Sequence, residues 1–204
     1  VLERFDLLDR IGAKHHAYKY KIATLIFHPI LQERDLYLEY LKNAVKVMWD
    51  KGFHLMLGAP NTDPGSSGIL DYFDSIKNDA KVTYYGNLGR LEFVNLLRTS
   101  EILIGNSSAG LLEAPSIPLP VINIGLRQRG RLCGDNIVFT NGNYSEISDA
   151  VDLCLSSDFS KKIRNSNNPY GDGNSVGRAH QLLKEIDFKR LMQKTEDPLD
   201  AKRI

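Results

Sequence analysis

Cysteine is scarce in this sequence, and that scarcity excludes several kinds of site. The 204 residues include two cysteines, Cys133 and Cys154, whose spacing fits neither a disulfide framework nor a metal-binding motif. The sequence also lacks a Walker phosphate-binding loop and a serine-histidine-acid set. We therefore expect a protein of the reducing cytoplasm that holds no metal and no organic cofactor.

An excess of either charge and a long apolar run are also missing. Lysine and arginine number 26 against 25 acidic residues, which leaves a net charge of +1. So small a charge gives no electrostatic reason to expect nucleic acid or an anionic membrane as a partner. No apolar run approaches the roughly 20 residues of a bilayer span, and no signal-peptide pattern opens the chain. The sequence therefore indicates a globular protein that is not embedded in a membrane.

Short apolar segments instead alternate with segments of helical spacing along most of the chain. The sequence predicts strands over residues 23–28, 53–57, 82–85, 102–104, 120–124 and 136–140. It predicts helices over residues 33–50, 69–76, 90–98, 108–114, 146–155 and 176–186. Such alternation is typical of parallel strands joined by right-handed crossovers. We predict an α/β fold with a doubly wound, Rossmann-like parallel sheet of about six strands.

The two ends of the chain lack this alternation. We interpret residues 1–22 as a segment that connects a missing N-terminal domain to a ligand-binding domain over residues 23–188. Within the first segment, residues 2–10 form a short amphipathic pattern without an obvious local partner. Residues 189–204 are polar, and we expect them to form a C-terminal tail.

The sequence GNSSAG, residues 105–110, joins a predicted strand to a predicted helix. Small residues let an anion approach the backbone, and free N–H groups and the helix dipole favour negative charge there. The hydroxyls of Ser107 and Ser108 add two further donors. An ordinary strand-to-helix connection would also need small residues. Gly105, Asn106, Ser107 and Ser108 are therefore candidate residues of an anion site.

Two charged residues nearby favour a nucleotide as the anion. Glu113 follows in the predicted helix, where a carboxylate can accept hydrogen bonds from both hydroxyls of a ribose. Arg127 is the first of three arginines in residues 125–131, a loop that follows the next predicted strand. The forked donors of arginine suit a diphosphate, although a solvated charged loop would have the same composition.

His28 and Asn61 follow two other predicted strands at the edge where ligands bind such sheets. The imidazole of His28 could donate to a phosphate or transfer a proton, although many single histidines have a structural role. Asn61 lies in a turn-rich loop, which could contact a ligand or simply connect two elements. No pair of carboxylates suited to acid–base catalysis is visible at these strand ends.

These motifs resemble the UDP-N-acetylglucosamine 2-epimerases, and within them the hydrolysing branch that makes N-acetylmannosamine for sialic acid. The resemblance rests on residues 28–29, 60–63, 104–110, 113, 120–125, 127–128, 130–131 and 170–174. It implies a fold of two Rossmann-like domains facing across a cleft, as in glycosyltransferases of the GT-B type. This chain resembles the half that holds UDP.

The resemblance also implies an activity and a role for each residue. In the family, residues matching Ser107 and Ser108 bind the diphosphate, and the residue matching Glu113 binds the ribose. The residue matching Arg127 lies by the nucleotide, and the one matching His28 reaches the phosphate or the sugar. The reaction is an anti elimination of UDP followed by hydration of the glycal, with acid–base carboxylates in the other domain. We expect UDP-N-acetylglucosamine as the substrate of the parent protein, a possible homodimer, and no catalysis by this fragment alone.

Three other functions fit the same motifs. The chain could belong to a hydrolysing 2-epimerase for UDP-diacetylbacillosamine, which the motifs do not separate from the first interpretation. It could be the donor domain of a UDP-sugar glycosyltransferase, for which we would not expect the arginine loop. It could also be a regulatory nucleotide-binding domain without catalysis.

Overall fold

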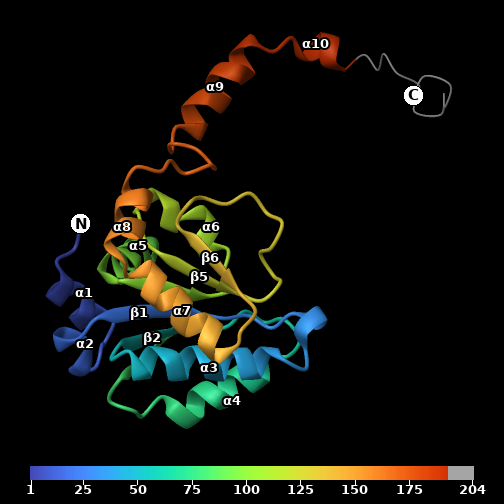
Figure 1. The fold of residues 1–204 in the computed structure, drawn as a ribbon. Helices are drawn as coiled ribbons and strands as arrows, with labels where there is room; N and C mark the ends of the chain where they lie inside the picture. Colours follow the sequence, from blue (N-terminus) through green and yellow to red (C-terminus); the bar gives the residue numbers. More distant parts are fainter. Residues whose placement is uncertain (193–204) are drawn as a thin grey trace. The chain divides into compact units, whose positions relative to one another are not determined.

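Six parallel strands form one sheet within residues 1–170, the first of two units into which the chain divides; the second is residues 171–204. The computed structural model describes residues 1–192. The strands are β1 (Ile22–Ile26), β2 (His54–Gly58), β3 (Val82–Tyr85), β4 (Ile102–Gly105), β5 (Val121–Ile124) and β6 (Ile137–Thr140). Their order, β3-β2-β1-β4-β5-β6, confirms the predicted doubly wound parallel sheet (Figure 1).

The helices of the first unit alternate with these strands. They are α1 (Arg4–Arg10), α2 (His16–Lys19), α3 (Tyr37–Asp50), α4 (Ser66–Ile76), α5 (Arg90–Thr99), α6 (Ala109–Leu112), α7 (Tyr144–Cys154) and α8 (Ser157–Arg164), with 3-10 turns η1 (Leu31–Glu33) and η2 (Ala114–Ser116). The predicted helix 33–50 begins four residues later, at Tyr37. The sequence did not predict α2 and α8. Helix α2 is a single turn, and α8 buries only two apolar side chains, Phe159 and Ile163, so neither gives a clear helical pattern of apolar residues.

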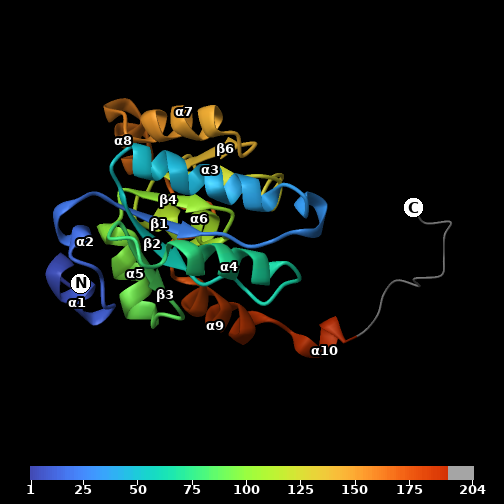
Figure 2. The same ribbon diagram turned by 90° about the horizontal axis from the view of Figure 1, so that it is seen from below.

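Both faces of the sheet are covered. Every residue of β1 is buried, and neighbouring residues face opposite sides of the sheet. Leu25 lies in a cluster with residues of α3, α4 and α7, whereas Ile26 lies in a cluster with residues of α5 and α6. Figure 2 shows α3 and α7 next to each other over one face of the sheet. Within residues 1–192, no helix is both long and apolar enough to cross a membrane.

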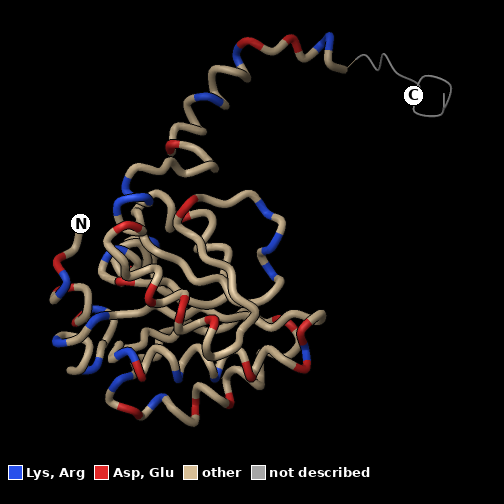
Figure 3. Tube along the Cα trace, viewed as in Figure 1, with Lys and Arg blue, Asp and Glu red and all other residues tan. Residues whose placement is uncertain are grey.

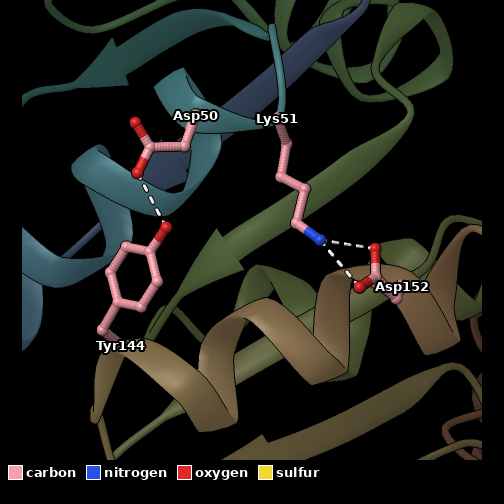
Figure 4. A network of polar contacts seen from close by, with 4 residues as sticks. All are labelled: Asp50, Lys51, Tyr144 and Asp152. Atoms are coloured by element: carbon pink, nitrogen blue, oxygen red, sulfur yellow. Dashed lines mark hydrogen bonds and ion pairs between the residues drawn. The ribbon is translucent and has the colours of Figure 1, made fainter.

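Polar contacts join the C-terminal end of α3 to α7 (Figure 4). The ammonium group of Lys51 donates to both carboxylate oxygens of Asp152, at 2.6 and 2.7 Å. The hydroxyl of Tyr144 donates to Asp50 at 2.7 Å. Exposed pairs such as these stabilise a fold only weakly, so the buried apolar face between α3 and α7 holds the two helices together.

The N-terminal helix α1 packs against other elements of the first unit, so it does have a partner, although not one close to it in the sequence. Leu7 and Leu8 are fully buried in a cluster with Met56, Tyr85 and Leu96. The sequence does not reveal this partner because the surface is assembled from β2, β3 and α5, far along the chain. That residues 1–22 connect to a preceding domain stays a prediction.

The second unit contains α9 (Ser175–Glu185) and α10 (Phe188–Leu191). Asp172 accepts two hydrogen bonds from Arg178, each 2.7 Å long, and these bonds hold the pKa of the carboxyl group well below its usual range. The division between the units falls inside the predicted domain 23–188, whose boundaries stay a prediction. Of the predicted tail 189–204, residues 193–204 lie outside the described part of the chain.

Candidate functional site

The candidate residues follow the carboxyl ends of four neighbouring strands. They are His28 after β1, Asn61 after β2, residues 105–110 at and after the end of β4, and Arg127 after β5. In the sheet, Ile26 at the end of β1 pairs with Gly58 of β2 and with Gly105 of β4. Because parallel strands end at one edge of a sheet, the structure brings these four segments together.

Gly105 is required by a close approach of two backbones. Its φ of +131° lies in a region that other residues rarely adopt, and a Cβ atom there would lie 2.0 Å from the carbonyl oxygen of Ile26. The next residue, Asn106, donates its backbone N–H to that oxygen at 3.1 Å. The turn that follows β4 is therefore fixed directly on the end of β1.

Asn106 connects three segments of the site. Its side chain accepts the backbone N–H of His28 and donates to the carbonyl of His28, both at 2.8 Å. Its own carbonyl accepts hydrogen bonds from Arg127 at 3.0 Å and from Gln128 at 2.9 Å. Asn106 is 1% exposed, so it organises the site rather than presenting its amide to solvent.

His28 is held as a neutral hydrogen-bond donor. Burial, and secondly the charge of Arg127, lower the pKa of His28 to about 4. Its Nδ1 atom accepts the backbone N–H of Asn61 at 3.1 Å, which leaves the proton of the neutral ring on Nε2. The side chain of Asn61 hydrogen-bonds the carboxylate of Asp63. In this structure Asn61 thus acts on His28 through its backbone.

The loop of residues 125–131, here called the arginine loop, carries three arginines. One of them contacts the turn of residues 105–110, here called the serine turn. Arg127 bonds the carbonyl of Asn106, and the half-buried position of its guanidinium lowers its pKa. Arg131 instead donates to Gln128 at 2.6 Å, and Gln128 is 1% exposed. Sequence reasoning did not single out Gln128 as a site residue, because an amide in a charged loop carries no signal of burial.

Arg129 points to a different part of the molecule. It donates to the carbonyl of Thr140 at 3.3 Å and to the side chain of Asn141 at 3.0 Å. Its guanidinium carbon lies 5.4 Å from the centre of the Phe139 ring. Figure 3 shows the basic positions along this loop between β5 and β6, and the contacts assign them separate roles.

The serine turn keeps free donors but leads into a shorter helix than the sequence predicts. Helix α6 is a single turn, and the predicted helix 108–114 breaks because Pro115 in η2 cannot continue an α-helix. Within residues 1–192, the backbone N–H groups of Ser107 and Ser108 have no acceptor. One turn supplies little macrodipole, so an anion there would depend on individual donors.

Glu113 lies at the end of α6, where it is half-buried. Its Oε2 atom is buried and has no hydrogen-bond partner among residues 1–192. A buried polar atom without a partner is costly in a folded protein, so its presence needs an explanation. Glu113 therefore remains a candidate ligand-binding residue.

A pocket of about 240 Å³ adjoins Ser107 at the ends of β1, β2 and β3. Phe93 and Tyr85 contribute to its lining, and the hydroxyl of Tyr85 is buried without a partner among residues 1–192. That burial raises the pKa of Tyr85 above its usual range. The sequence predicts Tyr85 at the carboxyl end of a strand but gives it no role in binding, and it does not indicate Phe93, because an aromatic in a strand or helix usually signals core packing.

Residues 4–184 match a family model described as UDP-N-acetylglucosamine 2-epimerase. The chain belongs to this family. It is 33% identical over 166 residues to a hydrolysing UDP-N,N'-diacetylbacillosamine 2-epimerase of Legionella pneumophila, a match that covers 81% of this chain and 43% of that protein. It is 31% identical over 131 residues to a UDP-N-acetylglucosamine 2-epimerase of Neisseria meningitidis, a match that covers 64% of this chain and 34% of that protein.

A solved structure of the family has the same fold. The UDP-N-acetylglucosamine 2-epimerase of Neisseria meningitidis, crystallised with UDP-N-acetylglucosamine, superposes with a TM-score of 0.68 at 19% identity. The superposition covers 89% of this chain and 49% of that one. This epimerase-family chain therefore has the Rossmann-like fold of about half of a GT-B-type structure, and it spans about half the length of its relatives.

Proposed function

We propose that this chain is the UDP-binding half of a hydrolysing UDP-N-acetylglucosamine 2-epimerase. The observation that carries the proposal is the cluster in which the serine turn, His28 and Arg127 meet around Asn106. Membership of the family supplies the substrate class, and the cluster supplies the chemistry that a diphosphate requires.

The diphosphate would contact donors from three segments. Arg127 uses Nη1 for Asn106 and keeps other N–H groups for phosphate oxygens. His28 keeps its Nε2 proton, and the turn keeps the free backbone N–H groups of Ser107 and Ser108. Fixed donors of this kind stabilise an anion without reorganising when it forms.

The nucleoside would use the two remaining features. The unpartnered oxygen of Glu113 suits the ribose hydroxyls, which donate to a carboxylate. The pocket beside Ser107 has aromatic lining and room for a single ring, which suits the uracil base. This assignment adds Tyr85 and Phe93 to the residues expected from the sequence.

The role of the chain in the reaction follows from this binding. In the elimination, the bond between C1 and the diphosphate oxygen breaks, and its electron pair leaves with UDP while a base removes the proton from C2. Water then adds across the double bond to give free N-acetylmannosamine. The donors around Asn106 would stabilise the negative charge that develops on UDP. With a pKa of about 4, His28 serves as a neutral donor at pH 7.

A second candidate substrate is UDP-N,N'-diacetylbacillosamine. It is favoured by the 33% identity to the Legionella pneumophila enzyme, which extends over 81% of this chain. The two sugars differ away from the nucleotide, so the donors for UDP serve either substrate.

Incubation of the full-length protein with each UDP-sugar alone tests these proposals. Release of UDP with free N-acetylmannosamine supports the first substrate, and release of the corresponding diacetylated sugar supports the second. Recovery of UDP-N-acetylmannosamine would indicate a non-hydrolysing enzyme. Sugar transfer that occurs only after an acceptor is added would contradict the epimerase proposal.

A further inference from the structure

Glu33 is a buried acid beside the loop that carries Arg127. It lies in η1, five residues after His28 in the sequence, and is 6% exposed. Two backbone hydrogen bonds hold its turn, from Glu33 N–H to Ile30 at 3.2 Å and from Leu36 N–H to Glu33 at 2.9 Å. The sequence gives this residue no role beyond the first position of the predicted helix 33–50.

The Glu33 carboxylate contacts the beginning of the arginine loop. Its Oε1 atom accepts the backbone N–H of Leu126 at 3.1 Å. A Cβ atom at Gly125, where φ is +77°, would lie 2.5 Å from Oε2 and 2.7 Å from Oε1. The loop therefore rests directly on the carboxylate, and only glycine fits at the point of contact.

A buried carboxylate in this position needs a reason. The ion pairs of residues 1–192 do not include Glu33. Burying a charge without a cation costs free energy, and an apolar side chain would pack without that cost. A charged acceptor does, however, make a stronger and more directional bond to a backbone N–H than a neutral one.

Two backbone bonds also hold the loop near Arg127, from Gly125 N–H to Thr140 and from Arg129 N–H to Leu126, both 3.0 Å long, but neither uses the N–H of Leu126. The side chain of Leu126 is 53% exposed, so apolar burial does not fix this residue. The next two residues, Arg127 and Gln128, both bond the carbonyl of Asn106. The loop is thus held at Leu126 by Glu33 and immediately afterwards by Asn106.

We propose that Glu33 is a positioning residue for Arg127: its carboxylate fixes the loop backbone at Leu126, and this fixes the guanidinium against the serine turn. The inference rests on the proposed UDP site, since Arg127 acts there. Glu33 itself contacts no substrate in this account. It sets the affinity for the diphosphate through the arginine.

Calorimetry of UDP binding to the full-length protein tests this role. Glu33→Ala is expected to weaken UDP binding about tenfold, and Glu33→Gln, which keeps an acceptor oxygen, is expected to restore most of the affinity. In an Arg127→Ala background, Glu33→Ala should change the affinity by less than about twofold, because the group that it positions is gone. Glu39→Ala, at an exposed acid in α3, is the matched control and should bind as the wild type does.

The outcomes separate this inference from the proposed function. If the wild type binds no UDP, the proposed function fails and the inference fails with it. If the wild type binds UDP and Glu33→Ala binds equally well, the inference alone is overturned. Losses from Glu33→Ala and Arg127→Ala that simply add would also overturn it. Should Glu33→Ala not fold, Glu33→Leu, which fills the same buried volume without an acceptor, must weaken binding in the presence of Arg127 and leave it unchanged in the Arg127→Ala background.

Discussion

His28 and His54 share a pKa that burial lowers to about 4, but they lie at opposite ends of their strands. His28 follows the carboxyl end of β1, and His54 is the first residue of β2. His54 uses both ring nitrogens internally, with His16 at 3.3 Å and Thr83 at 2.9 Å. His28 uses one nitrogen, for Asn61, and keeps the other for a ligand.

A perturbed pKa therefore does not by itself identify a functional residue. Burial lowers the pKa of a histidine wherever it occurs, because the charged form loses its hydration. What distinguishes the carboxyl edge is the set of donors and acceptors left free there, on His28, Glu113 and the serine turn. At the amino ends of the strands, both ring nitrogens of His54 already have hydrogen-bond partners within the protein.

The largest expected effect concerns Glu113 at the carboxyl edge. Glu113→Ala should lower UDP affinity by about 100-fold or more, because two charge-assisted hydrogen bonds to the ribose are lost. Calorimetry measures the affinity, and thermal unfolding checks that the fold survives. Glu101→Ala, at an exposed acid just before β4, is the control at the other end of the sheet. Unchanged binding by Glu113→Ala would remove this residue from the site.

Arg127 and Arg129 provide the next test within a single loop. Arg127→Ala should weaken UDP binding about 30-fold, through the loss of charge-assisted bonds to phosphate. Arg129→Ala should change it by less than about twofold, because that guanidinium contacts Thr140, Asn141 and Phe139 instead. Equal losses in titrations of both variants would contradict the separate roles.

Substitution of the two histidines should have opposite consequences: one should affect UDP binding and the other the stability of the fold. His28→Ala should weaken UDP binding about tenfold, as expected for one hydrogen bond to a phosphate. His54→Ala should leave UDP binding unchanged and lower the free energy of unfolding by about 2–4 kcal/mol, since it empties a fully buried position. Urea unfolding and calorimetry on both variants measure the contrast, and a loss of binding in His54→Ala would break it.

The last expected effect concerns stability and not binding: it is a pH dependence that His54 contributes. Its folded pKa of about 4 lies below the ordinary 6.5, so the unfolded chain binds more protons between these values. The stabilisation is present above pH 6.5 and is lost as the pH falls towards 4, by at most about 3 kcal/mol. Urea unfolding at pH 7 and pH 4.5 should show a smaller difference for His54→Gln than for the wild type, and an identical difference would contradict this assignment.

Much of the fold could be predicted from local pattern. Apolar runs broken by glycine and proline located all six strands, and polar residues after the strands located the candidate edge. Strand length and side-chain period are local properties, so one sequence carries them. The early end of α6 at Pro115 and the packing of α1 on α5 depend on neighbours, and the pattern did not reveal them.

The candidate site was predictable in its location but less so in its internal contacts. Gly105, Glu113 and Arg127 could be named because their chemistry is distinctive at that spacing. The organising role of Asn106, the burial of Gln128 and the contact between Glu33 and Leu126 arise between segments far apart in sequence. Such contacts depend on the register of the sheet and on loop geometry, which composition and periodicity do not specify.

A crystal structure of the full-length protein with UDP would show directly whether the nucleotide binds at the carboxyl edge. We expect the diphosphate against the N–H groups of Ser107 and Ser108 and the guanidinium of Arg127, with the ribose hydroxyls on Glu113. We also expect His28 Nε2 within hydrogen-bond distance of a phosphate oxygen. UDP bound away from the carboxyl edge, or with Glu113 and Arg127 both out of contact, would contradict the proposed UDP site.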